Sequence, residues 1–257
     1  MRVAILGTGH MGSWIASELS KENEVAVYDT DKSKAFGVAN VKVLSELSEL
    51  ASFQPELLIN AVSLQNTVAA FESVLRYLPG SCAIADLASI KTGLPEYYKK
   101  CGRRFASVHP MFGPTFANVE RLQEENVVLI KESDPEVIEF FRKFFKKLGL
   151  NLFYYTFKEH DEMMAYSLTL PFVASMIFAA CVNSKAVPGT TFKKHLAIAR
   201  GLLSEDDNLL SEILFNSFSI KQIENVTSGL EFLKHVIKDR DFEEAKRFFD
   251  KLRKNVR

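Results

Sequence analysis

The sequence is poor in cysteine and has no excess charge of either sign. Its three cysteines, Cys82, Cys101 and Cys181, are far apart, odd in number and without the spacing of a metal site. This usage argues against a disulfide framework and is typical of reduced thiols. Because 32 basic and 32 acidic residues balance to a formal net charge of zero, we expect no nucleic acid and no anionic membrane surface as a partner.

Other absences point the same way. We expect no apolar run long enough to cross a bilayer, and no signal segment, because the N-terminus enters a strand at once. The sequence therefore predicts a cytoplasmic protein without a membrane partner. A hydrophobic content of 47% over 257 residues is enough for one or two domains with a sizeable core.

The strongest motif lies in the first twelve residues. Residues 3–6 form a short apolar strand pattern, and Gly7, Gly9 and Gly12 follow it in G-x-G-x-x-G spacing before a helical pattern. Gly7 permits a tight turn, Gly9 has no Cβ to keep a pyrophosphate away, and Gly12 lets the helix approach the strand. The phosphates would then lie at a helix N-terminus, where unpaired N–H groups favour an anion.

A second expected strand, residues 24–28, leads into Asp29, where a carboxylate can accept the ribose hydroxyls of a dinucleotide. Such a carboxylate repels a 2′-phosphate, so we predict NAD as the cofactor. Lys32 and Lys34 keep NADP as the alternative. His10 occupies a variable position of the glycine loop, and its side chain has no assigned role. The residues predicted to line the cofactor are Gly7, Gly9, His10, Met11, Gly12, Asp29 and Ser63.

Strand and helix patterns alternate through the first half of the chain, which favours an α/β fold with a Rossmann-type, doubly wound and mainly parallel sheet. Helices are expected at 66–78 and 134–148. Further strands are expected at 41–44, 57–62, 82–85, 105–108, 127–130 and 152–155.

The pattern changes at Thr156, where Thr156 and Glu159 have capping-box spacing and the chain becomes helical to its end, with Pro171, Pro188-Gly189 and Gly229 as breaks. We therefore predict a dinucleotide-binding domain over 1–156 and an all-α domain over 157–257.

The helical half carries more apolar surface than its few helices can cover, for example at 172–182, so we expect it to form a homodimer. The alternative is that these helices only cover the sheet of their own chain.

Three polar clusters follow expected strands or begin the helical half: 86–91, His109 with its proline loop to Pro114, and 159–161. Ligands of doubly wound folds bind at the carboxyl ends of strands, so these clusters are candidate sites. Each also has a structural explanation. Asp86 could be a helix cap, Lys91 a solvated charge, and either histidine an ordinary loop or first-turn residue. Two prolines and a glycine predict an irregular loop from His109 onward.

Segments 86–91 (Asp-Leu-Ala-Ser-Ile-Lys) and 109–114 (His-Pro-Met-Phe-Gly-Pro) resemble the paired motifs of prephenate dehydrogenases, most closely the form fused to chorismate mutase in some bacteria. Glu159-His160-Asp161 also has a counterpart there. The similarity runs from Met1 to about Ala165 and thins beyond it to a general helical pattern.

The resemblance implies oxidation of prephenate by NAD⁺ to 4-hydroxyphenylpyruvate, carbon dioxide and NADH. His109 matches the histidine that accepts the hydrogen of the C4 hydroxyl, and neutral imidazole suits this task near pH 7. Ser89 matches the serine that orients the reacting groups. His160 matches a histidine near the substrate side chain, and the positive end of its helix should disfavour its protonation. Lys91 would attract the dianionic substrate or fix the loop.

The resemblance also implies an arginine from the helical half that holds the ring carboxylate, because a planar fork pairs well with a carboxylate. Arg200 is the candidate, although the segment after it needs a one-residue shift to align. It could instead be a surface charge, with Lys193, Lys194 and His195 as the basic alternative.

Rival functions remain at this point. Arogenate dehydrogenase acts on the amino analogue of prephenate, an imine or pyrroline-carboxylate reductase shares the two-domain plan, and a nucleotide-sensing scaffold would have lost the chemistry. The basic stretch 251–257 ends without a clear stop signal, so the chain could also be one piece of a larger fused protein.

Overall fold

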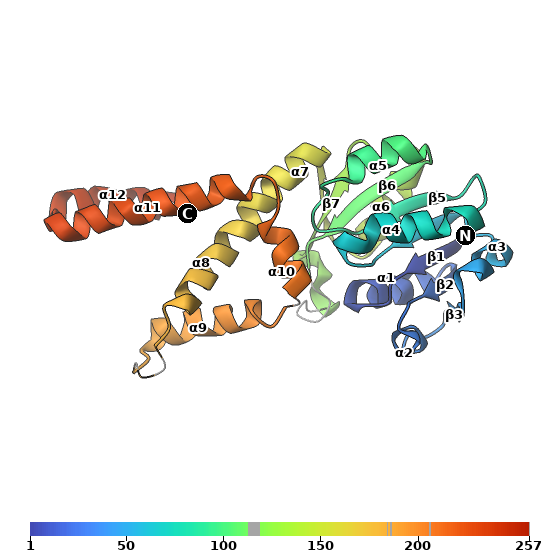
Figure 1. Ribbon diagram of the computed structural model, residues 1–257, viewed down its shortest axis with the longest axis horizontal. Coiled ribbons are helices and arrows are strands. Elements are labelled where there is room, and N and C mark those ends of the chain that lie inside the picture. Colours follow the sequence, from blue (N-terminus) through green and yellow to red (C-terminus); the bar gives the residue numbers. More distant parts are fainter. Residues whose placement is uncertain (113–118, 184, 186, 206, 257) are drawn as a thin grey trace. The chain divides into compact units, whose positions relative to one another are not determined.

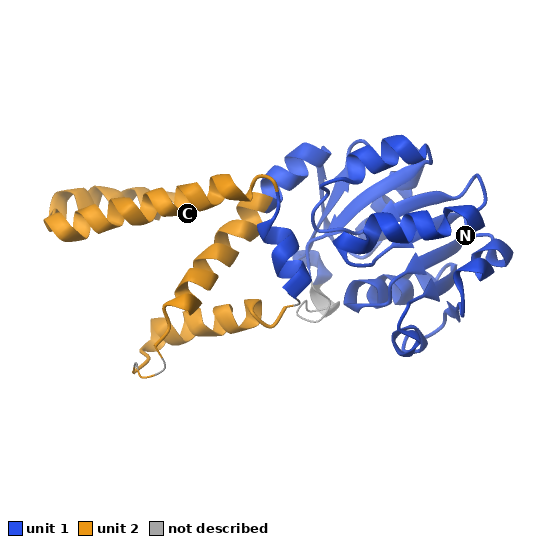
Figure 2. Cartoon of the chain, in the orientation of Figure 1, with its two compact units in different colours: residues 1–164, 206–216 blue, residues 165–205, 217–257 orange. Residues whose placement is uncertain are grey.

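The computed structural model describes residues 1–112, 119–183, 185, 187–205 and 207–256. The chain forms two compact units (Figure 2). The sheet-bearing unit contains Met1–Met164 and Asp206–Asn216, and the helical unit contains Ala165–Glu205 and Ser217–Arg257. The sheet-bearing unit thus continues past residue 156 through α7 (Phe157–Met164) and takes in α10 (Asp207–Leu214). The division of functions between 1–156 and 157–257 stays a prediction.

An eight-stranded sheet organises the first unit, in the order β3-β2-β1-β4-β5-β6-β7-β8. Every neighbouring pair is parallel except β6 and β7, so the expectation of a doubly wound, mainly parallel sheet is confirmed. The strands are β1 (Arg2–Leu6), β2 (Glu24–Tyr28), β3 (Lys42–Val43), β4 (Leu57–Asn60), β5 (Ala83–Asp86), β6 (Phe105–Pro110), β7 (Asn126–Ile130) and β8 (Asn151–Tyr155).

Helices cover both faces of this sheet (Figure 1). Strand side chains alternate between two cores, so Val3 and Ile5 face one and Ala4 and Leu6 the other. The first core receives α1 (His10–Ser20), α2 (Lys32–Phe36) and α6 (Pro135–Lys147). The second receives α3 (Leu50–Phe53), α4 (Leu64–Val74), α5 (Leu94–Cys101) and α7, with the short turns η1 (Leu47–Glu49) and η2 (Leu75–Tyr77) nearby; η3 (Val119–Glu124) precedes β7.

The capping box at the start of α7 forms as the spacing predicts. Glu159 N–H donates to Thr156 Oγ1 at 3.1 Å, and Thr156 N–H donates to Glu159 Oε2 at 2.7 Å. The reciprocal pair fixes where α7 begins, and with it the positions of the residues in its first turn.

One local expectation at the site is wrong. His109 and Pro110 belong to β6, where they pair with Val128 and Val127 of antiparallel β7, so the irregular loop begins after them. Proline is tolerated at this strand end because the ladder continues without its missing N–H, through Met111 N–H and Asn126 O at 2.9 Å. Gly113 and Pro114 of the motif lie outside the described residues.

The helical unit contains π-helix η4 (Ala165–Thr169), α8 (Leu170–Ala180), α9 (Thr190–Leu202), α11 (Ser219–Asp239) and α12 (Phe242–Asn255), so the expected helical C-terminal half is confirmed. Buried hydroxyls of Thr169 and Ser219 lie 2.8 Å apart and join η4 to α11. Gly229 is not a break, because α11 runs through it.

The expectation that no stretch could cross a membrane is also wrong by length and composition. Helix Phe157–Ala180 has 24 residues and a mean hydropathy of 1.6 over its most apolar window, of which 17% is buried. Residues 163–180 contain no Asp, Glu, Lys or Arg; Ser167, Thr169, Pro171 and Ser175 interrupt the apolar run but not the helix. One helix of this kind does not distinguish a membrane span from a helix that packs against protein.

Candidate active site

The glycine loop joins β1 to α1 with little room on one side and open space on the other. A Cβ on Gly12 would lie 2.0 Å from the Gly7 carbonyl oxygen, so no side chain fits there. Gly7 has φ +86°, a left-handed conformation that glycine adopts freely. A Cβ on Gly9 would meet nothing within 4 Å. The loop therefore packs tightly at Gly12 and leaves space at Gly9, as a pyrophosphate site at a helix N-terminus requires.

Asp29 lies at the carboxyl end of β2 and is held by the loop itself. Its Oδ2 accepts the Thr8 N–H at 2.6 Å and the Thr8 hydroxyl at 3.0 Å, and its Oδ1 accepts the Asp31 N–H at 2.9 Å. Partial burial alone would raise the pKa of Asp29, but these hydrogen bonds and nearby Lys34 lower it below the ordinary value. Asp29 is therefore a fixed, ionised acceptor. Thr8 was not among the predicted site residues, because it occupies a variable position of the motif.

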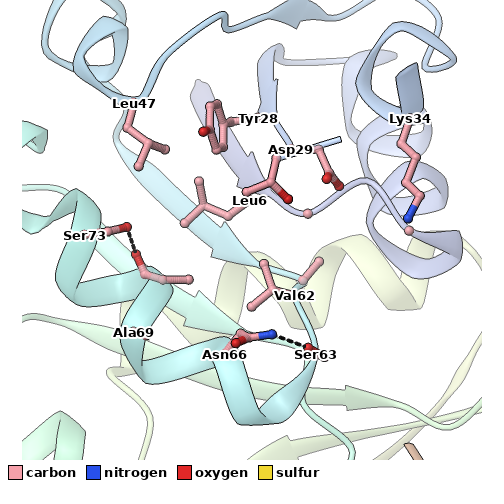
Figure 3. A pocket seen from close by; sticks show the side chains of 15 residues that line it. Leu6, Tyr28, Asp29, Lys34, Leu47, Val62, Ser63, Asn66, Ala69 and Ser73 are labelled. Atoms are coloured by element: carbon pink, nitrogen blue, oxygen red, sulfur yellow. Dashed lines mark hydrogen bonds between the residues drawn. The ribbon is translucent and has the colours of Figure 1, made fainter. Parts of the chain in front are cut away.

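A cleft of about 560 Å³ opens beside this loop (Figure 3). Asp29 and Lys34 line one side, and Ser63 and Asn66 line the other. Lys32 is not available to the cleft, because its Nζ donates to the Ser45 carbonyl at 2.5 Å and lies 4.1 Å from the Tyr28 ring centroid. Lys32 and Lys34 were the reason for keeping NADP as the alternative cofactor, and of the two only Lys34 lines the cleft.

A smaller pocket of about 280 Å³ lies next to the first, with Ser63 lining both. Met11 and Ser89 also line it, which brings two further predicted residues together. Glu212 of α10 also lines it and accepts the N–H of Gln65, in the first turn of α4, at 3.0 Å. Glu212 was not among the predicted site residues, because nothing in the sequence of the helical half indicates that α10 returns to the sheet-bearing unit. His10 is exposed at the first position of α1.

The register of the sheet aligns these pockets with the other polar clusters. Leu6, Asn60, Asp86 and Ser107 form one row across β1, β4, β5 and β6. The residues that follow them, including the glycine loop, Ser89 and His109, therefore lie along the carboxyl edge of the parallel strands. This edge is where doubly wound folds bind their ligands.

Two buried histidines meet at this edge. His109 Nδ1 lies 3.0 Å from His160 Nε2, and the two side chains are 5% and 0% exposed. On its other side, His160 Nδ1 lies 2.8 Å from Asp161 Oδ1. Burial lowers the pKa of His109 well below its usual value, and His160 and Lys91 lower it further. Burial is also the main cause of a lowered pKa at His160, so the predicted direction holds with a different cause.

Lys91 is buried, so it is not the solvated charge that was one explanation of this residue. Its side chain is fully buried, with Nζ 2.6 Å from Asp86 Oδ1 and 2.9 Å from the Val108 carbonyl oxygen. Tyr98 donates its hydroxyl to Asp86 Oδ2 at 2.7 Å. Burial lowers the pKa of Lys91, while Asp86 opposes that shift. Of the two roles considered for Lys91, this placement supports fixing the loop and β6, one residue before His109.

The remaining predicted residues are less constrained. Ser89 is half-buried at the pocket edge, and Arg200 is exposed on α9 of the helical unit, as are Lys193, Lys194 and His195. The assignment of a carboxylate-binding arginine stays a prediction.

The two glycines give a paired test of the loop. Gly12→Ala is expected to destabilise the sheet-bearing unit by about 3 kcal/mol, because a Cβ 2.0 Å from backbone oxygen forces α1 away from β1. Gly9→Ala is expected to change stability by less than about 1 kcal/mol and to weaken dinucleotide binding instead, since its Cβ enters open space. Chemical unfolding followed by fluorescence of Trp14, the single tryptophan, and titration with NADH measure both effects. Equal stability of the two variants would contradict this account of the loop.

Comparison with known proteins agrees with this geometry. Residues 15–154, more than half of the chain, match the family described as prephenate dehydrogenase, nucleotide-binding domain. The T-protein of Enterobacter agglomerans is 26% identical over 151 residues. That match covers 55% of this chain and 40% of the relative, so the chain spans less than half the length of this curated relative.

Solved structures show the same fold over the whole chain. The prephenate dehydrogenase from A. aeolicus, in complex with hydroxyphenyl propionate and NAD⁺, superposes with a TM-score of 0.85 at 18% identity, covering 100% of this chain and 97% of that one. The Synechocystis arogenate dehydrogenase superposes with a TM-score of 0.75 at 19% identity, covering 100% and 99%.

Proposed function

The chain belongs to the prephenate dehydrogenase family, and from this membership we propose that it catalyses the NAD-dependent oxidative decarboxylation of prephenate to 4-hydroxyphenylpyruvate in tyrosine biosynthesis. The observation that carries the proposal is His109, a buried imidazole kept neutral at the carboxyl edge of the parallel strands, the edge along which the glycine loop and Ser89 also lie. An imidazole in this state can accept a hydrogen from a substrate hydroxyl.

The chain's residues fit NAD. The open space at Gly9 admits a pyrophosphate, and the fixed carboxylate of Asp29 can accept a ribose hydroxyl at Oδ1 and repel a 2′-phosphate. The similar A. aeolicus structure contains NAD⁺. When bound, the cofactor supplies the acceptor for the hydride that leaves C4 of the substrate ring.

His109 would accept the hydrogen of the C4 hydroxyl as the hydride leaves, and return it to the same oxygen when the ring carboxylate departs as carbon dioxide. Aromatisation of the ring drives this step, so positioning is the main task of the protein. Ser89, at the edge of the pocket that Met11 also lines, would orient the hydroxyl toward the imidazole.

The helical unit would complete the substrate site and form a homodimer in the cytoplasm. Arg200 is the proposed partner of the ring carboxylate. Large apolar side chains exposed on its helices support a subunit interface, among them Ile177 on α8 and Ile220, Leu230 and Ile237 on α11.

The proposal is tested by NADH formation with purified protein. Prephenate with NAD⁺ is expected to give turnover, and NADP⁺ is expected to be at least about tenfold poorer in kcat/KM, because Asp29 repels its extra phosphate. Arogenate is assayed in parallel, since the amino group that distinguishes it from prephenate lies at the side chain and away from the C4 hydroxyl.

The outcomes separate the rivals. Turnover with arogenate but not with prephenate would mean that the reaction is the one proposed and that its substrate is arogenate. NADPH-dependent reduction of a cyclic imine would overturn the proposal in favour of a reductase, and dinucleotide binding without turnover of any of these compounds would favour a scaffold.

A further inference from the structure

The donor and the acceptor of each hydrogen bond around the histidine pair can be identified by starting from Asp161. Asp161 Oδ1 accepts the Lys91 backbone N–H at 2.8 Å, and a carboxylate oxygen has no hydrogen of its own to donate. His160 Nδ1, 2.8 Å from the same oxygen, must therefore carry the hydrogen and donate it. With Nδ1 protonated, the neutral ring of His160 has a bare Nε2.

The next contact follows from the first. His109 Nδ1 lies 3.0 Å from the bare Nε2 of His160, so His109 must hold its own hydrogen on Nδ1 and donate it. Its Nε2 is then unprotonated. Within the described part of the chain Nε2 makes no hydrogen bond, so it is the nitrogen left for a ligand.

We propose that Asp161 is a positioning residue which, through His160, sets the proton on His109 Nδ1 and so presents His109 Nε2 to the substrate as the hydrogen acceptor. The family resemblance of segment 159–161 implies no role for Asp161, and this proposal gives it one. In this proposal His160 links the Asp161 carboxylate to His109, whereas the family resemblance implies a position near the substrate side chain. The kinetic part of this inference rests on the proposed function, whereas its spectroscopic part does not.

Asp161 is itself held by other parts of the chain, through both its carboxylate and its backbone carbonyl. Thr92 Oγ1 donates to Asp161 Oδ2 at 3.2 Å, from the segment after β5. Asn216, which follows α10, donates to the Asp161 carbonyl at 2.8 Å, and the residue begins the second turn of α7. Because Asp161 is only 6% exposed, its charge acts on the histidines with little screening by solvent.

The charge also matters when His109 takes up the substrate hydrogen. The O–H bond of the C4 hydroxyl breaks as the N–H bond at Nε2 forms, and the resulting imidazolium donates Nδ1–H to His160 while Asp161 stabilises the positive charge. The other charged groups facing the pair are the ammonium of Lys91 and the carboxylate of Asp86, which form their own ion pair. Asp161 is therefore the carboxylate in direct contact with the histidine pair.

The proton positions can be observed without substrate. In protein carrying ¹⁵N-labelled histidine, a long-range ¹H–¹⁵N correlation spectrum at pH 8 distinguishes protonated from bare ring nitrogens. His109 and His160 are both expected as Nδ1–H tautomers, the form that free neutral histidine prefers less. Spectra of His109→Asn and His160→Asn proteins assign the two rings among the five histidines. An Nε2–H tautomer at either ring overturns the proposal, whatever the protein's activity.

Asp161→Asn tests the charge. The amide oxygen can still accept from Lys91 N–H and His160 Nδ1, and its nitrogen can replace Oδ2 beside Thr92, so the geometry is preserved. We expect kcat to fall about 10- to 100-fold with an unchanged KM for NAD⁺, because a neutral hydrogen bond supports the imidazolium less than a charged one. The acid-side midpoint of the pH profile is expected to move to lower pH, since loss of the negative charge makes the pair harder to protonate.

Glu159→Gln is the matched control. It removes one negative charge from the first turn of the same helix and keeps an acceptor for Thr156 N–H, but it lies on the exposed side of α7. It is expected to keep the wild-type kcat and pH midpoint. An Asp161→Asn protein with an unshifted midpoint and a wild-type kcat would overturn the role of the charge. If no variant or wild type turns over substrate, the proposed function fails, and the ¹⁵N titration of His109 and His160 in both proteins decides the inference alone.

Discussion

Replacing His109 with asparagine is expected to lower kcat by about 10²- to 10⁴-fold and to leave the affinity for NADH unchanged. Asparagine can still donate a hydrogen bond toward His160, but it has no basic nitrogen to accept the C4 hydrogen. The residues proposed to hold the dinucleotide, the glycine loop and Asp29, follow other strands at the same edge and keep their contacts. Initial rates of NADH formation give kcat, and energy transfer from Trp14 to bound NADH gives the dissociation constant.

The pH profile provides a second measure of the same residue. The proposed mechanism needs the neutral form of His109, and burial lowers the pKa of this ring well below its usual value. Activity is therefore expected to be flat near pH 7 and to be lost on the acid side, below the midpoint of about 6.5 that an ordinary histidine would give. His235→Asn, at an exposed position of α11, is the control and should keep both kcat and midpoint. Turnover of His109→Asn at the wild-type rate would contradict the assignment of the hydrogen acceptor.

The sequence was sufficient for the parts of this site that depend on local geometry. Gly7, Gly9 and Gly12 act through backbone shape and the absence of Cβ atoms, so their spacing alone indicated the cradle that the structure contains. The acid at the end of β2 and the capping box at Thr156 are equally local. For these features a few neighbouring residues contain the whole physical reason.

The contacts that organise the chemistry are not local. His109 and His160 are 51 positions apart in the sequence, and Lys91 and Asp161 are 70 apart. Their meeting depends on the antiparallel pairing of β7 with β6 and the parallel pairing of β8 with β7, after which α7 brings His160 to His109. Strand patterns alone do not specify whether one strand of a mainly parallel sheet is reversed.

Two further elements show the same limit. Helix α10 follows two helices of the other unit and returns to the sheet-bearing unit, where Glu212 contacts the start of α4. Helix α5 was not among the expected elements, although Gly93 with φ +83° and Pro95 mark its beginning. Without α5, Tyr98 has no place beside Asp86, and the surroundings of Lys91 cannot be inferred.

Lys91→Met is expected to destabilise the sheet-bearing unit by about 3–5 kcal/mol. The ammonium and its partner Asp86 are both fully buried, so removing the lysine leaves a buried carboxylate with no cation beside it. The Val108 carbonyl also loses its 2.9 Å contact with Nζ. Unfolding by urea, followed by Trp14 fluorescence, measures the loss. Lys99→Met, at an exposed position of α5, is the control and should cost less than about 1 kcal/mol.

A second substitution separates the cost of a lone charge from the cost of lost packing. In the double variant Lys91→Met with Asp86→Asn, the amide oxygen can still accept from the Ala88 N–H and the amide nitrogen can donate to the Tyr98 oxygen, and no uncompensated charge remains. The double variant is therefore expected to be more stable than Lys91→Met alone by about 2 kcal/mol, because the desolvation penalty of the isolated carboxylate disappears. Equal stability of the two would mean that the methylene stem of Lys91, and not its charge, holds β6 in the place from which His109 reaches the substrate.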